Sequence, residues 1–178
     1  MAATLAVALA ISLAGCGGSS NDESGATRQS VEAYVAQVEP IRLGTNHLLE
    51  RADPITSAYH EHRLSAEVAQ RRIEALEHRL SDYAVKIASV APVPPTLEST
   101  ERAYAHVWVL QDTYLSALAQ AIPERDFEGL PDYENRQREA ITAWRIQLQA
   151  VADQVGAKLP RDIQIAGRGE IRPSPIGD

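Results

Sequence analysis

The chain has 178 residues, of which 44% are hydrophobic and 23% are charged, and its formal net charge is −7. This length suits one domain with its own core, and 24 acidic against 17 basic residues, without a basic block, argue against a nucleic-acid-binding protein. The single cysteine excludes an intrachain disulfide and any cysteine-rich zinc site.

The N-terminal segment 1–15 is almost wholly apolar and leads directly to that cysteine. Its apolar run from Ala2 to Ala14 is shorter than the roughly 20 residues of a membrane-spanning helix. Its length is typical of the apolar part of an export signal. The run ends in Leu13-Ala14-Gly15-Cys16, which is a branched apolar residue, two small residues and a cysteine. This pattern resembles the lipobox of bacterial lipoproteins.

The resemblance implies that a diacylglyceryl group modifies Cys16, that cleavage precedes it, and that residues 1–15 are a signal peptide. Residues 16–26 would then be a flexible, lipidated tether, and the protein would be held at the extracytoplasmic face of the cell membrane or in the periplasm. Several acyl chains on one residue bind a bilayer persistently without a transmembrane helix. Because no Lys or Arg precedes Arg28, we expect the natural start to lie upstream.

Between residues 27 and 158 the apolar residues recur at helical spacing, and no strand alternation is evident. The clearest stripe alternates steps of four and three residues, which is the spacing of a buried helix face. We expect Ser65 to cap this helix and the prolines from Pro92 onward to end it. The stripe consists of Ala69, Ile73, Leu76, Leu80, Tyr83, Ile87 and Val90.

Two further helices are predicted downstream. The first begins near Thr96 and stops at Pro123, and the second begins near Pro131 and ends at Gly156. Their stripes are Tyr104, Trp108, Gln111, Leu115, Leu118 and Ile122, and then Gln137, Ile141, Trp144, Leu148, Val151 and Val155.

The first helical region is less regular because Pro40 and Pro54 interrupt it. Either one long helix is kinked twice, or Asp53 and Pro54 begin a new segment that runs to about His62. Both alternatives keep one apolar face. This face contains Val31, Val35, Val38, Thr45, Leu49, Ala52 and Tyr59.

Four helices of similar length with short connections predict an all-α fold, an antiparallel four-helix bundle over residues 27–158. The alternative is a three-helix bundle with the N-terminal helix detached. We expect the Pro- and Gly-rich tail 159–178 to be irregular, although Ile163, Ile165 and Ile171 could place it against the bundle.

No convincing catalytic or metal centre follows from the sequence. No histidine is preceded by a Glu at three positions, as a di-iron bundle would require, and the apolar stripes contain no Asp or Glu. The outward positions of His47, His78 and His106 indicate solvated side chains. His60 and His62 are the only weak candidates for binding Zn²⁺ or Cu²⁺, and they would need a third ligand from elsewhere.

A polar pocket for a small amphipathic ligand is a second hypothesis for the helical core. Its lining would be Tyr104, Trp108, Gln111, Tyr114 and Trp144, although aromatic residues at helical spacing more often form plain core. The sequence therefore predicts a lipid-anchored, non-enzymatic protein without a cofactor, with a binding or scaffolding role in the cell envelope. Its expected partners are the membrane, through Cys16, and an envelope protein. The alternatives are small-ligand binding and metal binding.

Overall fold

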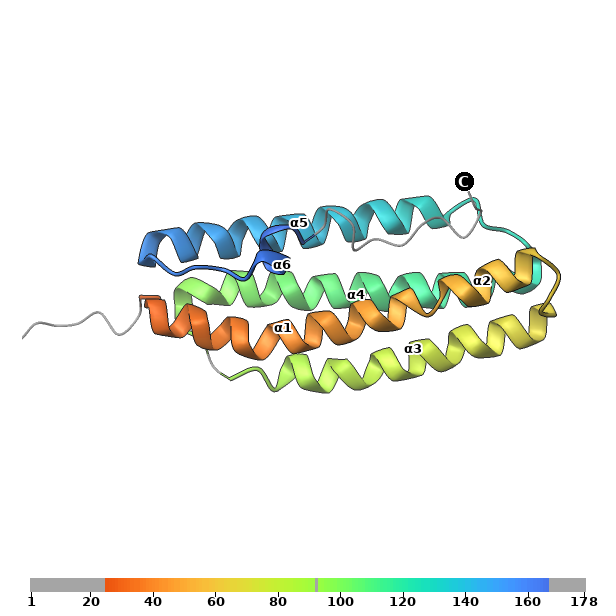
Figure 1. Ribbon diagram of the computed structural model, residues 1–178, viewed down its shortest axis with the longest axis horizontal. Coiled ribbons are helices and arrows are strands. Elements are labelled where there is room, and N and C mark those ends of the chain that lie inside the picture. The colour runs from red at the N-terminus through yellow and green to blue at the C-terminus, as the bar shows by residue number, and fades with distance from the viewer. Residues whose placement is uncertain (1–24, 92, 167–178) are drawn as a thin grey trace, which may run out of the picture.

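The computed structural model describes residues 25–91 and 93–166, and every regular element in these ranges is an α-helix (Figure 1). The all-α prediction is therefore confirmed for this part of the chain. The elements are α1 (Arg28–Glu50), α2 (Asp53–His60), α3 (Ala66–Ala88), α4 (Pro95–Glu124), α5 (Leu130–Val155) and the short α6 (Arg161–Gln164).

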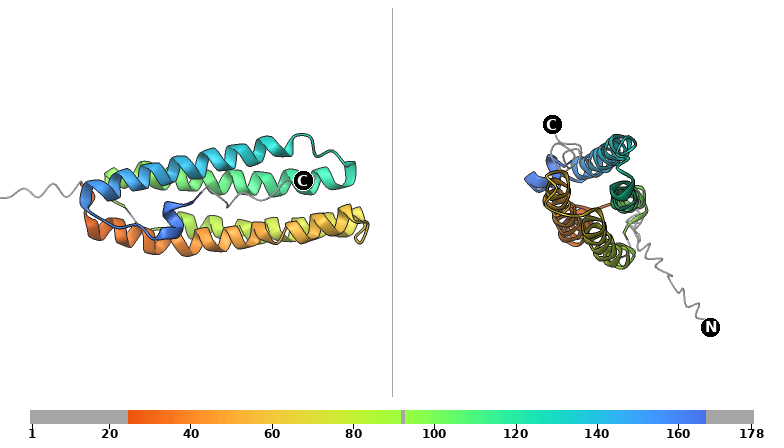
Figure 2. Two further views of the ribbon diagram at one scale, coloured as in Figure 1. Left: turned by 45° about the horizontal axis from the view of Figure 1, so that its top comes forward. Right: turned by 90° about the vertical axis from the view of Figure 1, so that its right-hand side faces the viewer.

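The long helices run side by side along one axis (Figures 1 and 2). Helix α2 continues the direction of α1, so the two together span the length of the molecule. Helix α4 packs against both α3 and α5, and α1 packs against α3, α4 and α5. Within the described ranges, no helix combines the length and the apolar character that crossing a membrane requires.

Local side-chain chemistry explains where the helices begin and end. Thr27 caps α1, since its hydroxyl accepts a hydrogen bond from the Ser30 amide at 3.1 Å. Ser65 caps α3 as predicted, accepting from the Val68 amide at 3.3 Å. Gly156 ends α5 with φ = 67°, the left-handed conformation that glycine adopts without strain.

The prolines act differently from one another. Pro40 lies inside α1, which continues to Glu50, and Pro54 lies in the first turn of α2. The second alternative for this region is thus correct, although α2 ends at His60. The expectation that Pro123 stops α4 is wrong, because Pro123 lies in the last turn and Arg125, with φ = 55°, ends the helix.

The predicted stripes form the interior of the molecule. All their members are buried or half-buried in the structure. They divide into two core clusters. The first contains Val31, Val35, Tyr104, Trp144 and Leu148, and the second contains Leu49, Ile73, Leu80, Leu115 and Ile122. Tyr83 and Trp108 pack against both clusters and connect them.

The segment after α5 turns back along the helices and corrects the expectation of an irregular tail (Figure 2). Residues 161–164 form α6, and Ile163 is 1% exposed in the first core cluster with Leu159 and Ala166. The segment folds onto the bundle because this buries the apolar side chain of Ile163, which lies one turn after Pro160. Ile165 is 47% exposed, and Ile171 lies outside the described residues.

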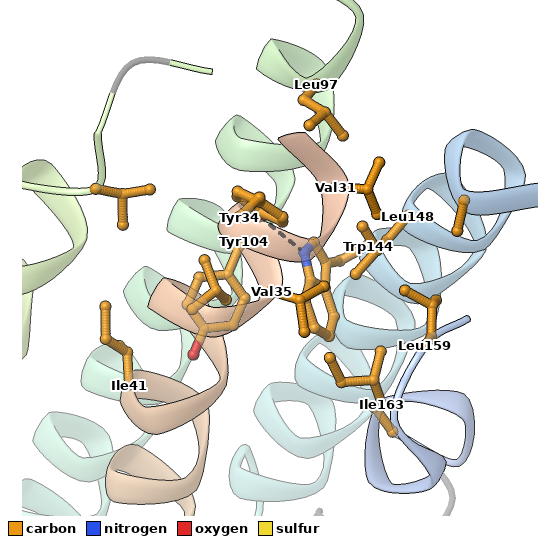
Figure 3. Close-up of a cluster of buried hydrophobic side chains, with 14 of the residues drawn as sticks. Val31, Tyr34, Val35, Ile41, Leu97, Tyr104, Trp144, Leu148, Leu159 and Ile163 are labelled. Atoms are coloured by element: carbon orange, nitrogen blue, oxygen red, sulfur yellow. Dashed lines mark hydrogen bonds between the residues drawn. The ribbon is translucent and has the colours of Figure 1, made fainter. Parts of the chain in front are cut away.

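Helix α1 is not detached, as the three-helix alternative would require. Val31 and Val35 on α1 share the first cluster with Leu148 on α5 and with Leu159 and Ile163 (Figure 3). The C-terminal segment and α1 therefore bury their apolar residues together against α5.

Candidate functional site

Two of the five predicted pocket residues lie against each other in the first core cluster (Figure 3). The rings of Tyr104 and Trp144 are 5.1 Å apart between centroids and are inclined by 52°, a favourable aromatic arrangement. The Trp144 indole N–H donates to the Tyr34 hydroxyl at 3.2 Å. Both side chains are therefore fixed by packing and by a polar contact within the core.

The other three predicted residues lie further along α4. The Trp108 indole donates to the Leu80 carbonyl at 3.1 Å, and the Gln111 amide donates to the Asn46 side chain at 3.5 Å. Tyr114 belongs to the second core cluster. The structure thus brings Tyr104 and Trp144 together but distributes the remaining residues along the helix.

Trp108 lines an apolar groove on the surface between α3 and α4. The groove has a volume of ≈ 400 Å³, and its walls include Ile87, Ala88 and Ala105, with Val109 beside Trp108. Glu101 and Arg102 supply its charged lining residues. Trp108 is therefore a predicted pocket residue that lines an accessible groove.

The sequence reasoning missed a buried cation, Arg42, which is only 1% exposed. Its guanidinium donates two hydrogen bonds to Glu39, at 2.8 and 2.7 Å, in a fork-to-fork ion pair within α1. Arg42 lies four residues after Val38 and three before Thr45, so it continues the alternating stripe of α1. That position is the available signal, but a charged side chain is not expected on a buried helix face.

Two tyrosine hydroxyls belong to the same polar part of the core. Burial raises the pKa of Tyr104, partly offset by its hydrogen bond with Thr45 and by the charge of Arg42. Burial also raises the pKa of Tyr34. Both phenols therefore stay protonated at neutral pH and act as hydrogen-bonding groups rather than as bases.

Glu134 corrects the expectation that the stripes contain no carboxylate. It precedes Gln137 by three residues on the buried face of α5 and is 9% exposed. Its Oε1 atom has no hydrogen-bond partner within the part of the chain that the structure describes. Burial raises the pKa of this carboxyl, while the nearby Arg138 lowers it and Asp53 raises it further. The sequence signal was again its place in the stripe.

Within the part of the chain that the structure describes, His60 and His62 have no third ligand beside them. His60 is exposed, with its ring 5.3 Å from that of Phe127, and His62 is exposed in the left-handed conformation with φ = 57°. Over residues 25–91 and 93–166, no group of three or more His, Cys, Asp or Glu could hold a metal ion. His47, His78 and His106 are exposed, as predicted.

Cys16, the predicted lipidation site, lies outside the described residues. Comparisons with protein-family models, with curated protein sequences and with solved structures find no significant match. Functional inference therefore depends on the residues of this chain alone.

Proposed function

We propose that this protein is a lipid-anchored, extracytoplasmic lipoprotein with a non-enzymatic binding or scaffolding role in the bacterial cell envelope. The observation that carries the proposal is the apolar segment ending in Leu13-Ala14-Gly15-Cys16. Helix α1 begins at Arg28, 12 positions after Cys16, so residues 16–26 are available as a tether. Two or three acyl chains on Cys16 would then hold the helical domain close to the bilayer.

We further infer that the helical domain is an antiparallel four-helix bundle, with α1 and α2 together as its first member. The inference is supported by the contacts of α4 with α3 and α5, and by those of α1 with α3, α4 and α5. A core built from alternating four- and three-residue steps favours the same arrangement. A scaffolding role is compatible with a domain whose helices are joined by buried contacts such as the Trp144–Tyr34 hydrogen bond.

Metabolic labelling with a palmitate analogue tests the anchor. Cys16→Ser removes the thiol that carries the lipid, so we expect the label to disappear and the protein to leave the membrane fraction. Ser19→Ala, three residues away, is the matched control and should keep both label and membrane association. Labelling that persists in Cys16→Ser, or membrane release that occurs equally in Ser19→Ala, contradicts the proposal.

The second candidate function is binding of a small amphipathic ligand, favoured by the groove that Trp108 lines. The chain has two tryptophans, so Trp144→Phe leaves Trp108 as the single indole reporter. We expect N-phenyl-1-naphthylamine to quench Trp108 by energy transfer at micromolar concentration. Trp108→Phe leaves the buried Trp144 as a control that should respond more weakly. Equal responses of the two variants count against binding in this groove.

A further inference from the structure

Three arginines line one open groove at the junction of α1, α2 and α3. The groove has a volume of ≈ 430 Å³. Arg51 comes from the turn between α1 and α2, and Arg72 and Arg79 come from α3. Among residues 25–91 and 93–166, no acidic side chain lines it. In a chain of net charge −7, this is a local concentration of positive charge.

The helix geometry of α3 explains why two of these arginines act together. Arg72 and Arg79 are seven residues apart, so they lie on the same face about 10 Å apart along the axis. Ala75 and Leu76 lie between them on that face and also line the groove. The small side chain of Ala75 leaves space between the two cationic side chains.

The ion pairs of the described chain do not include the three arginines of the groove. The ion pairs that the structure shows involve Arg28, Arg42, Arg63 and Arg102, with a further contact at His47. Arg51, Arg72 and Arg79 form no side-chain ion pair within residues 25–91 and 93–166. Their hydrogen-bond donors are therefore available to an anion that enters the groove.

The other walls of the groove are apolar. Ile55 of α2 is half-buried and Leu76 is 4% exposed, and Pro54 lies beside Ile55. Guanidinium groups bind carboxylates and phosphates through paired hydrogen bonds, and apolar walls favour a hydrocarbon substituent. The arginine side chains and the apolar walls together fit an anion that carries a hydrocarbon group.

We propose that the groove between Arg51, Arg72 and Arg79 binds a phosphate or carboxylate group carried on an apolar substituent. The guanidinium groups hold the anion, and Ile55 and Leu76 contact the substituent. The proposal goes beyond the lipid anchor and does not depend on Cys16, so each can fail without the other.

Titration calorimetry of the full chain with hexyl phosphate tests the site. We expect binding that is tighter than that of inorganic phosphate. Arg72→Gln and Arg79→Gln should each weaken it by about tenfold, since each removes a charge-assisted contact. Arg71→Gln is the matched control, because Arg71 is exposed on the same helix, does not line the groove and removes the same charge.

A second variant tests the shape of the groove without changing its charge. Ala75→Leu keeps a good helix former but fills the space between the arginines, so it should also weaken hexyl phosphate binding by about tenfold. Competition by phosphatidylglycerol vesicles would identify a lipid headgroup as the source of the anion, and its absence a free small molecule. No binding of hexyl phosphate at millimolar concentration, or equal weakening by Arg71→Gln and Arg72→Gln, overturns the proposal.

Discussion

Trp144 and Tyr34 form a hydrogen bond between two buried side chains that are 110 residues apart in the sequence. The indole N–H of α5 donates to the hydroxyl of α1 at 3.2 Å, and that hydroxyl is 3.5 Å from the Thr100 carbonyl of α4. A single tyrosine oxygen therefore connects three helices. Because Trp144 is fully buried, no solvent can replace the acceptor.

Tyr34→Phe should lower the free energy of unfolding by about 1–3 kcal/mol, because it leaves the Trp144 N–H without its acceptor. Urea unfolding followed by circular dichroism measures the loss. Tyr133→Phe is the matched control, since Tyr133 is half-buried and forms no side-chain hydrogen bond within the described residues. Its loss should stay below about 0.5 kcal/mol. Similar losses in the two variants would show that the Trp144 contact contributes little.

The two arginine–glutamate ion pairs of α1 differ in burial and should differ in strength. Glu39→Gln removes the charge that faces Arg42, whose side chain is 1% exposed, so we expect a loss of about 1–3 kcal/mol in unfolding free energy. Glu32→Gln breaks the Arg28 pair, whose side chains are 66% and 51% exposed, and should cost less than about 0.5 kcal/mol. Equal costs in urea unfolding would mean that burial of Arg42 does not strengthen its pair.

Helices α3 and α1 differ in how well their buried faces can be predicted from the sequence. In α3 an apolar residue recurs at every fourth or third position, so the sequence predicts its buried face completely. In α1 the same stripe includes Arg42, whose charge conceals its position. Composition alone assigns arginine to the surface, whereas the ion pair with Glu39 offsets part of the cost of burying this charge.

The candidate sites were less predictable because they combine residues that are distant in the sequence. Arg51, Arg72 and Arg79 come from two helical regions, and only the packing of α1 and α2 on α3 brings them to one groove. The five predicted pocket residues are spread along α4 and α5 for a related reason. Stripe periodicity indicates which face of a helix is buried, but it does not show which residues of other helices lie at the same level.

Gly44 lies where the ring of Tyr83 on α3 approaches the backbone of α1. A Cβ atom at position 44 would lie 2.7 Å from Tyr83 Cζ and 2.8 Å from Cε1, which is closer than packed atoms allow. Gly44→Ala should therefore lower the unfolding free energy by about 1–3 kcal/mol, although alanine is the better helix former. Thermal unfolding measures the effect, and Gly129→Ala, with nothing within 4 Å, is the control.

A double-mutant cycle identifies Tyr83 as the cause of that loss. In a Tyr83→Ala background the clash is absent, so Gly44→Ala should become neutral or stabilise by up to about 1 kcal/mol through helix propensity. If Gly44→Ala is equally destabilising in both backgrounds, the close approach to Tyr83 is not its reason.

Glu134 should make the protein less stable as pH rises. Burial raises the pKa of this carboxyl in the folded state, so its ionisation costs more when folded than when unfolded. Below the ordinary pKa of Glu, about 4.3, the group is neutral in both states and the cost vanishes. Glu134→Gln removes the ionisable group and should raise the midpoint of thermal unfolding by about 1–3 °C at pH 7.

The same substitution should have little effect at pH 3, where Glu134 is protonated in the parent protein. Glu139→Gln is the control on the same helix, since Glu139 is exposed and the variant has the same net charge. For Glu139→Gln, the change in unfolding midpoint relative to the parent protein should be the same at pH 3 and at pH 7. For Glu134→Gln, that change should be larger at pH 7. Scanning calorimetry at both pH values makes the comparison, and a stabilisation by Glu134→Gln that is as large at pH 3 as at pH 7 would exclude the buried charge as its origin.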